Sequence, residues 1–421
     1  MSAGRPSRDG ERFRLGINYW PARTAMGWWS AFERSEVAED FSRIAASGFD
    51  SIRLFLTWED FQPTPDSVDA PMIARLVQSL ELAKDSGLSV MPTLFTGHMS
   101  GVNWIPPWAL GEGGGDARFR VVSNRSLVGP RLRNWYSDEA VLRAQILLAS
   151  TLARAVAGHD ALWAWDLGNE NSNCVMPPSR PDGRNWLFRV GDAIRNADAD
   201  ALVTVGLHME DLEQDRRLGP AEAAGACDFL QMHGYPGYAA WARGPTDETL
   251  LPFLARVTRW LAGGAQVLFA EFGVPTYRRG DPEGERVRRT SQAELVEEEE
   301  AASYIARALD ALLESGCTGA LLWCHADYVP GIWENPPLDK AVHERSFGLW
   351  RADGSPKPAL ATAEKFAKLK AAVRTRESEL LGGAAWIDID QTEFYRTPGA
   401  HLPRLYRRYC AASEKVRRAS P

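Results

Sequence analysis

Short apolar segments alternate along the chain with longer amphipathic segments. Several of the short segments are apolar at consecutive positions, as in Leu162–Trp165, which is typical of parallel strands with helices on one side and a barrel core on the other. The pattern predicts eight strands, near Arg14–Ile17, Ser51–Phe55, Ser89–Leu94, Leu162–Leu167, Leu202–Gly206, Phe229–Met232, Gln266–Ala270 and Gly319–Leu322.

The amphipathic segments predict helices between these strands. The first four of the helices named below have polar or acidic residues near their starts and a glycine just after their ends, which is how helices commonly begin and end. We expect a capping role for Ser35, and a solvated acidic first turn at Glu297–Glu300 that favours the helix dipole. The clearest helices are predicted over Ser35–Ser47, Ala70–Ser86, Ser137–Ala157, Glu294–Ser315 and Pro358–Arg374.

Eight strand-then-helix units predict an α/β fold, namely a (β/α)8 TIM barrel. The barrel is expected to occupy residues 1–374, of which 1–11 form a polar N-terminal segment. Residues 375–421 contain the apolar stretches Trp386–Asp390 and Leu402–Tyr409, so this C-terminal extension is expected to fold back onto the barrel.

Two of the predicted loops are long. They follow the third and seventh strands, over Gly97–Asn134 and Thr276–Ala293. In a barrel of this kind the loops after the strands surround the catalytic face, so long loops there are expected to wall in a ligand. Aromatic residues near the strand ends are candidates for the wall, about half of them being expected to serve packing instead: Tyr19, Trp20, Trp58, Trp104 and Trp108.

Composition and charge narrow the possible partners. The net charge of −7 argues against nucleic acid or an anionic membrane as the main partner. The chain has no apolar run of about 18 residues and no apolar N-terminal run of signal-peptide length. The five cysteines are odd in number and none has CxxC spacing, which favours reduced thiols and a cytoplasmic location. The sequence leaves the oligomeric state open.

Two glutamates hold the strongest chemical signal. Glu170 ends the segment Trp165–Glu170 after the fourth predicted strand, and Glu271 lies in Leu268–Gly273 at the end of the seventh. Side chains at these strand ends face the barrel mouth, so the two carboxyl groups would face each other across a cavity. Such a pair suits glycoside hydrolysis, in which one group is protonated and the other ionised. Repulsion between the like charges is expected to separate the two pKa values in this way. Either glutamate alone could equally be a surface acid in an ion pair.

With these residues the sequence resembles glycoside hydrolase clan A, most closely family 5, over roughly Arg14 to Lys370. The resemblance implies a retaining β-glycosidase with Glu170 as acid/base and Glu271 as nucleophile. Six further positions match the substrate-binding residues of that family. They lie in Ile52-Arg53-Leu54-Phe55, Thr96-Gly97-His98, Asn169, Met232-His233-Gly234-Tyr235 and Trp323.

The resemblance implies a role for each of these six residues. Arg53 and Tyr235 would hold the nucleophile, Asn169 would bind the sugar 2-hydroxyl, and Trp323 would form the floor under the sugar ring. His98 and His233 would bind sugar hydroxyls or tune Glu170. Taken singly, Arg53 could be part of a barrel ion pair, His98 and His233 could be core histidines, and Trp323 could be a packing residue. Only their joint placement favours function.

Motifs for other chemistries are missing from the sequence. It has no GxxxxGK[ST], HExxH or GxSxG segment, so we expect neither a metal nor an organic cofactor. The predicted reaction is hydrolysis of β-glycosidic bonds by double displacement, exo-acting on short β-manno-oligosaccharides. The alternatives are a β-glucosidase, an endo-β-mannanase, a transglycosylase using the same glutamates, or a carbohydrate-binding barrel without activity.

Overall fold

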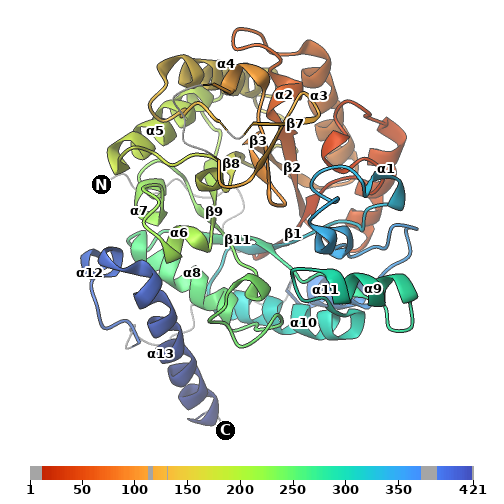
Figure 1. Ribbon diagram of the computed structural model, residues 1–421, viewed down its shortest axis with the longest axis vertical. Coiled ribbons are helices and arrows are strands. Elements are labelled where there is room, and N and C mark those ends of the chain that lie inside the picture. Colours follow the sequence, from red (N-terminus) through yellow and green to blue (C-terminus); the bar gives the residue numbers. More distant parts are fainter. Residues whose placement is uncertain (1–11, 112–116, 130, 371–385, 420–421) are drawn as a thin grey trace.

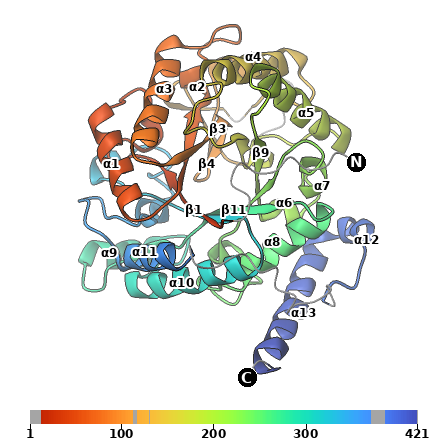
Figure 2. The same ribbon diagram turned by 180° about the vertical axis from the view of Figure 1, so that it is seen from behind.

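The computed structural model describes residues 12–111, 117–129, 131–370 and 386–419. Eight parallel strands close into a barrel in the order β1-β14-β11-β10-β9-β8-β3-β2, and helices surround it (Figures 1 and 2). This confirms the predicted (β/α)8 fold. The barrel strands are β1 (Arg14–Tyr19), β2 (Ser51–Thr57), β3 (Ser89–Thr96), β8 (Trp165–Asn169), β9 (Val203–His208), β10 (Leu230–His233), β11 (Val267–Phe272) and β14 (Gly319–Leu322).

The outer helices follow the strands in chain order. Five of these helices were predicted from the sequence, and their described ends agree with the predictions to within four residues. The predicted end at Arg374 lies outside the described residues. Two capping residues differ from the prediction. Ser35 lies inside the first helix, whose cap position is Glu33, and Asp138 rather than Ser137 caps the fourth. The helices are α1 (Arg34–Ala46), α2 (Trp58–Phe61), α3 (Ala70–Asp85), α4 (Glu139–Ala155), α5 (Arg180–Ala197), α6 (Glu210–Glu213), α7 (Pro220–Ala223), α8 (Leu250–Leu261), α9 (Pro282–Thr290), α10 (Glu298–Glu314) and α11 (Pro358–Lys370).

The acidic run before α10 differs from the prediction. Val296–Glu297 forms the short strand β13, which pairs with β12 (Thr276–Tyr277), so the helix begins only at Glu298. Glu298 is buried and its Oε1 accepts a hydrogen bond of 2.9 Å from Arg351. The expectation of a fully solvated acidic turn is therefore wrong for Glu298, because the loop after β14 folds across this helix start.

The loop after β3 contains a small sheet of its own. Its strands are β4 (His98–Met99), β5 (Val102–Trp104), β6 (Arg120–Ser123) and β7 (Ser126–Val128). The loop after β14 is also long, which the sequence analysis missed, and includes the 3-10 turns η5 (Pro330–Ile332) and η6 (Val342–Ser346). Other 3-10 turns are η1 (Ala25–Gly27), η2 (Pro107–Ala109), η3 (Asn171–Asn173) and η4 (Pro236–Tyr238).

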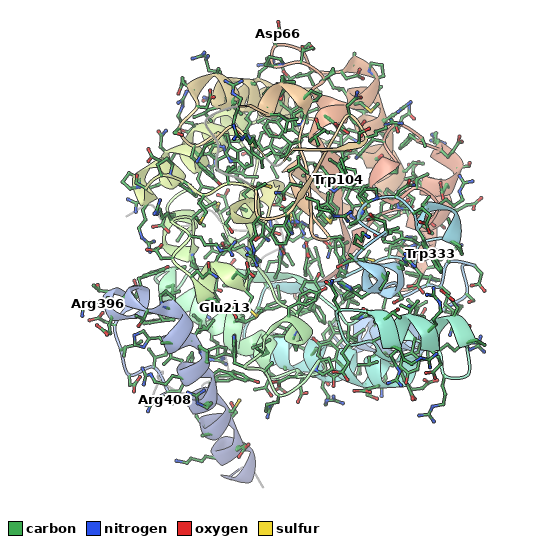
Figure 3. All side chains as sticks on the ribbon, viewed as in Figure 1. Asp66, Trp104, Glu213, Trp333, Arg396 and Arg408 are labelled. Atoms are coloured by element: carbon green, nitrogen blue, oxygen red, sulfur yellow. The ribbon has the colours of Figure 1, made fainter. Side chains whose placement is uncertain are left out.

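The C-terminal extension packs on the barrel helices. It consists of α12 (Gln391–Arg396) and α13 (Pro398–Ala419), and α13 contacts α6 and α8 before it extends past the ring of helices (Figure 1). Figure 3 labels Arg396 and Arg408 on this unit. The predicted boundary at residues 374 and 375 lies outside the described residues. No described helix combines the length and hydropathy needed to cross a membrane.

A separate cluster of buried side chains fills one layer of the barrel. Leu268 and Ala270 are two residues apart on β11 and belong to it, as alternate positions on one face of a strand should. Met91 on β3 and Leu321 on β14 join them. This packed layer closes the barrel, so any ligand must bind above it, at the carboxyl ends of the strands.

Candidate active site

Arg53 on β2 is the centre of the polar network in the barrel. Its side chain is completely buried, and its Nε and Nη2 donate to Oδ2 of Asp166 at 2.9 and 2.7 Å. Nη1 donates to Oε1 of Glu271, and Nη2 donates to Oδ1 of Asn169 at 2.8 Å. Burial lowers the pKa of Arg53, but the charges of Asp166 and Glu271 outweigh it and raise the pKa overall. Arg53 therefore supplies a fixed positive charge beneath the site.

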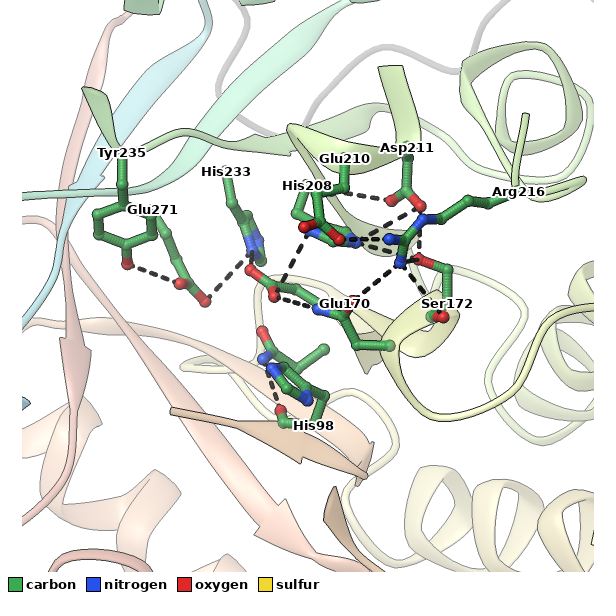
Figure 4. A network of polar contacts seen from close by, with 12 residues as sticks. His98, Glu170, Ser172, His208, Glu210, Asp211, Arg216, His233, Tyr235 and Glu271 are labelled. Atoms are coloured by element: carbon green, nitrogen blue, oxygen red, sulfur yellow. Dashed lines mark hydrogen bonds and ion pairs between the residues drawn. The ribbon is translucent and has the colours of Figure 1, made fainter. Parts of the chain in front are cut away.

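Glu271 reaches the barrel mouth because β11 is irregular near its end. Met232 pairs with Phe269, but the next residue, His233, pairs with Glu271, so one residue of β11 is extra. A bulge of this kind redirects the side chains that follow it. Leu268 and Ala270 face the buried layer, and yet Glu271 also points inward. Its Oε2 accepts a hydrogen bond of 2.8 Å from the hydroxyl of Tyr235 (Figure 4).

Glu170 follows β8 directly and has left-handed backbone geometry, with φ of 49°. Its Oε1 lies 3.0 Å from Nδ1 of His233, and its Oε2 accepts a bond of 3.1 Å from Nδ2 of Asn173. Nδ1 of His208 lies 3.8 Å from Oε2 (Figure 4). Burial raises the pKa of Glu170. The charge of His208 and the hydrogen bond and charge of His233 lower it by a larger amount, so the net shift is downward.

The arrangement of charged groups around Glu170 and Glu271 differs from the one expected from the sequence. We expected repulsion between two carboxylates to separate their pKa values. Instead His233 lies between them, because its Nδ1 is also 3.4 Å from Oε1 of Glu271. One carboxylate oxygen of Glu170 and one of Glu271 are within 4.8 Å of each other and of a His233 nitrogen. His233 therefore links the two carboxyl groups through polar contacts.

Asn169 and His98 lie beside Glu170. Nδ2 of Asn169 donates to the backbone oxygen of His98 at 2.7 Å, which leaves one amide hydrogen for a ligand. Nδ1 of His98 lies 2.8 Å from Oδ1 of Asn103, and burial lowers the pKa of His98. His98 lines the cavity described below, so both residues are in position to contact a ligand.

A cavity of about 420 Å³ lies above the two glutamates. Trp323, directly after β14, lines it as expected. The other aromatic candidates do not: Tyr19, Trp20 and Trp58 are buried in the core. Trp104 and Trp108 belong to the loop after β3 and pack against the core, where the ring of Trp108 lies edge-on to that of Trp58. The aromatic residues that line the cavity are Phe119, Tyr235, Tyr238 and Trp323.

Sequence analysis thus placed all eight residues at the site but missed others. His208 ends β9, two residues past the strand predicted, and the rule applied to the other strands would have found it. Tyr238 and Glu344 also line the cavity. Glu344 lies on η6, in a loop whose position is set by tertiary packing, so no local pattern signals it.

Among the described residues, one group could offer three ligand atoms to a metal ion, namely Glu170, His233 and Glu271. Glu271 already accepts hydrogen bonds from the Arg53 guanidinium and from Tyr235. That guanidinium compensates the carboxylate charge and would repel a cation at the same oxygen. The donor set therefore fits acid–base and nucleophilic chemistry better than metal binding.

Comparisons with known proteins agree with this geometry. Residues 14–310 match the model for cellulase, glycosyl hydrolase family 5. A curated relative, "Putative mannan endo-1,4-beta-mannosidase 5" of Oryza sativa subsp. japonica, is 25% identical over 330 residues, which cover 69% of this chain and 62% of the relative.

Solved structures show the same fold. The exo-beta-1,4-mannosidase Op5Man5 from Opitutaceae bacterium strain TAV5 is 27% identical with a TM-score of 0.71, covering 87% of this chain and 61% of that one. A GH5_18 protein from Streptomyces cattleya in complex with GlcNAc is 21% identical with a TM-score of 0.78, covering 97% and 93%. The chain spans less than two thirds of the length of the rice relative and of the Opitutaceae enzyme. Because the family model matches most of the chain, this protein belongs to glycosyl hydrolase family 5.

Proposed function

We propose that the chain is a retaining β-glycosidase that removes mannose from the ends of short β-manno-oligosaccharides. One observation carries the proposal: carboxylate oxygens of Glu170 and Glu271 lie within 4.8 Å of each other beside the cavity. Retaining enzymes hold their two carboxyl groups about 5–5.5 Å apart, whereas inverting enzymes need roughly 6.5–9.5 Å to admit a water molecule.

In the proposed first step Glu271 attacks the anomeric carbon. Arg53 keeps this carboxylate ionised and oriented through a charge-assisted hydrogen bond, and Tyr235 holds the second oxygen. The hydrogen bond at the oxygen that becomes bonded to the anomeric carbon weakens, because that oxygen loses its negative charge. Asn169 offers its remaining amide hydrogen to the sugar 2-hydroxyl, where contacts strengthen in the transition state.

Glu170 delivers the proton that the leaving oxygen needs. The histidines lower the pKa of Glu170, and protonation of this carboxyl group when the substrate binds is part of the proposal. Glycosylation of Glu271 removes one negative charge beside His233. Glu170 then deprotonates water, which releases the sugar with net retention.

Two observations support exo action on mannosides. The cavity of about 420 Å³ is at the small end of ligand sites, which span roughly 300–1,000 Å³, and so suits a short saccharide. The Opitutaceae structure at 27% identity is an exo-β-1,4-mannosidase, although the rice relative is named an endo-mannosidase.

The deciding experiment compares p-nitrophenyl β-mannoside and β-glucoside, and mannobiose, mannotriose and polymeric mannan, with NMR of the first product anomer. We expect turnover of the β-mannosides, initial release of β-mannose, and slow action on polymer. Initial α-mannose would overturn retention, and rapid fall of mannan viscosity would establish endo action. Products formed only with an added acceptor sugar would indicate a transglycosylase. Unchanged turnover by Glu271→Gln would remove Glu271 from the mechanism.

A further inference from the structure

Glu344 is a carboxyl group in the cavity that the mechanism above does not use. It is only 7% exposed, and it lies on η6 in the loop after β14. Its Oε2 accepts hydrogen bonds from Oγ of Ser100 at 3.0 Å and from Nε1 of Trp323 at 3.3 Å. The carboxyl group is therefore fixed at the edge of the indole ring that lines the cavity.

The surroundings of Glu344 differ from those of the other buried glutamates. Four described glutamates are buried, and three of them pair with arginine: Glu222 with Arg180, Glu271 with Arg53, and Glu298 with Arg351. No arginine or lysine within the described residues forms an ion pair with Glu344. The nearest basic group, Nε2 of His343, is 3.7 Å from Oε1, and burial lowers the pKa of this histidine to about 4.

One oxygen of Glu344 has spare acceptor capacity. Oε1 receives only a long contact of 3.5 Å from the hydroxyl of Tyr238, although a carboxylate has about four acceptor positions. Burying an incompletely bonded carboxyl group costs stability, so a protein keeps one mainly where a ligand completes its bonding. Here the group lines the cavity, between Trp323 and Tyr238.

We propose that Glu344 is a substrate-binding residue whose free oxygen accepts hydrogen bonds from hydroxyl groups of the sugar ring that lies on Trp323. The inference rests on the proposed function, since it adds a specificity-determining group to the same site. Sugar hydroxyls at the ring's edge suit a carboxylate held at the edge of the indole. The carboxylate also sets which epimers fit, because an epimer that turns its hydroxyl away leaves the buried oxygen unpaired.

The test pairs variants with substrates that lack single hydroxyl groups. p-Nitrophenyl β-mannoside and its 2-, 3-, 4- and 6-deoxy analogues are assayed with the wild type, Glu344→Ala, Glu344→Gln and Ser100→Gly. The last variant removes one donor to Glu344 at a position with φ of 52°, where glycine adds no strain. Glu314→Ala, an exposed carboxyl group outside the cavity, is the control.

We expect Glu344→Ala to lower kcat/KM on the parent mannoside by about 10- to 100-fold, the effect of losing one or two hydrogen bonds to a charged group. On the analogue that lacks the contacted hydroxyl, the same variant should lose less than about threefold. Glu344→Gln keeps an acceptor for Ser100 and Trp323 and should lose less than the alanine variant. Glu314→Ala should match the wild type.

Equal losses on every analogue would overturn the inference, because that pattern means that Glu344 only positions Trp323. Stronger binding of an amino sugar than of the parent would also overturn it, since the group would then recognise a cation. The affinities for mannose and the deoxymannoses, measured by calorimetry, do not depend on turnover. They therefore distinguish a failure of the proposed glycosidase function from a failure of the proposed role of Glu344. If the wild type hydrolyses no β-glycoside, the proposed function fails, whereas a sugar affinity that Glu344→Ala leaves unchanged rejects the role of Glu344.

Discussion

At the scale of single residues, the site depends on a few hydrogen bonds whose removal leaves the fold intact. Tyr235→Phe deletes only the hydroxyl that donates to Oε2 of Glu271. A hydrogen bond to a charged group contributes about 1.5–3 kcal/mol, so kcat should fall roughly 10- to 100-fold. Tyr304→Phe is the matched control, because that buried hydroxyl has no partner among the described residues. Equal kcat values for the two variants would show that Tyr235 does not hold the nucleophile.

The acidity of Glu344 gives a second prediction at this scale. Burial raises its pKa to about 7 from 4.5, with smaller contributions from the charges of Glu271 and Glu170 and with opposition from Ser100 and Trp323. The folded state thus binds a proton that the unfolded state releases between these pH values. Stability therefore falls as pH rises from about 4.5 to about 7, by about 3 kcal/mol in total.

Glu344→Gln cannot ionise and escapes this loss. Denaturant unfolding should show the variant more stable than the wild type by up to about 3 kcal/mol at pH 8, and close to it at pH 5. A stability difference that is the same at both pH values would contradict the assigned pKa. The measurement needs no substrate and is independent of the reaction.

At the scale of secondary-structure elements, the positions of the strand ends could be predicted from the sequence, whereas the register between neighbouring strands could not. Residues at strand ends are readable from the pattern, so Glu170 and Glu271 could be placed in one mouth, whereas Arg53, which lies inside β2, was found through the family resemblance. The bulges in β8 and β11 could not be predicted from the sequence. On β8, Asp166 pairs with Thr204 and Asn169 with Gly206, so this strand shifts register just as β11 does. These shifts arise from contacts between neighbouring strands, which a single sequence does not display.

Gly168 makes the shift on β8 possible. Its φ is 151°, and a Cβ atom there would lie 2.3 Å from Oδ1 of Asn171. Gly168→Ala should therefore displace the Asn169–Glu170 pair, and displacement by about 1 Å can cost roughly 100-fold in kcat/KM. Gly158→Ala is the control. Its φ of 69° also disfavours alanine, but a Cβ atom there would meet no other atom within 4 Å. We expect its kcat/KM to be unchanged, and equal losses in both variants would refute the steric argument.

At the scale of the whole molecule, the C-terminal extension packs against the barrel helices. The apolar stretches of the extension predicted that it is folded. They did not predict where it packs, because the helices it contacts, α6 and α8, are distant in the sequence. Tyr406 on α13 is buried, with its ring centroid 5.1 Å from that of Phe253 on α8 and 5.2 Å from that of Trp241. Its hydroxyl donates to Asp247. The extension thus adds a buried aromatic ring to a cluster whose other members, Phe253 and Trp241, belong to the barrel domain.

Tyr406→Ala tests this coupling. Removing a buried aromatic ring costs roughly 3–5 kcal/mol, and here it also deprives Asp247 of one hydrogen-bond donor, leaving those from Arg243 and from the backbone N–H of Thr249. Arg404→Ala on the same helix removes a partly exposed pair with Asp388 and should cost less than about 1 kcal/mol. If the extension and the barrel unfold as one unit, Tyr406→Ala shifts the unfolding midpoint of the whole protein, followed by circular dichroism and by loss of activity. An early transition of the extension alone, with activity kept, would mean that the barrel is stable without α13.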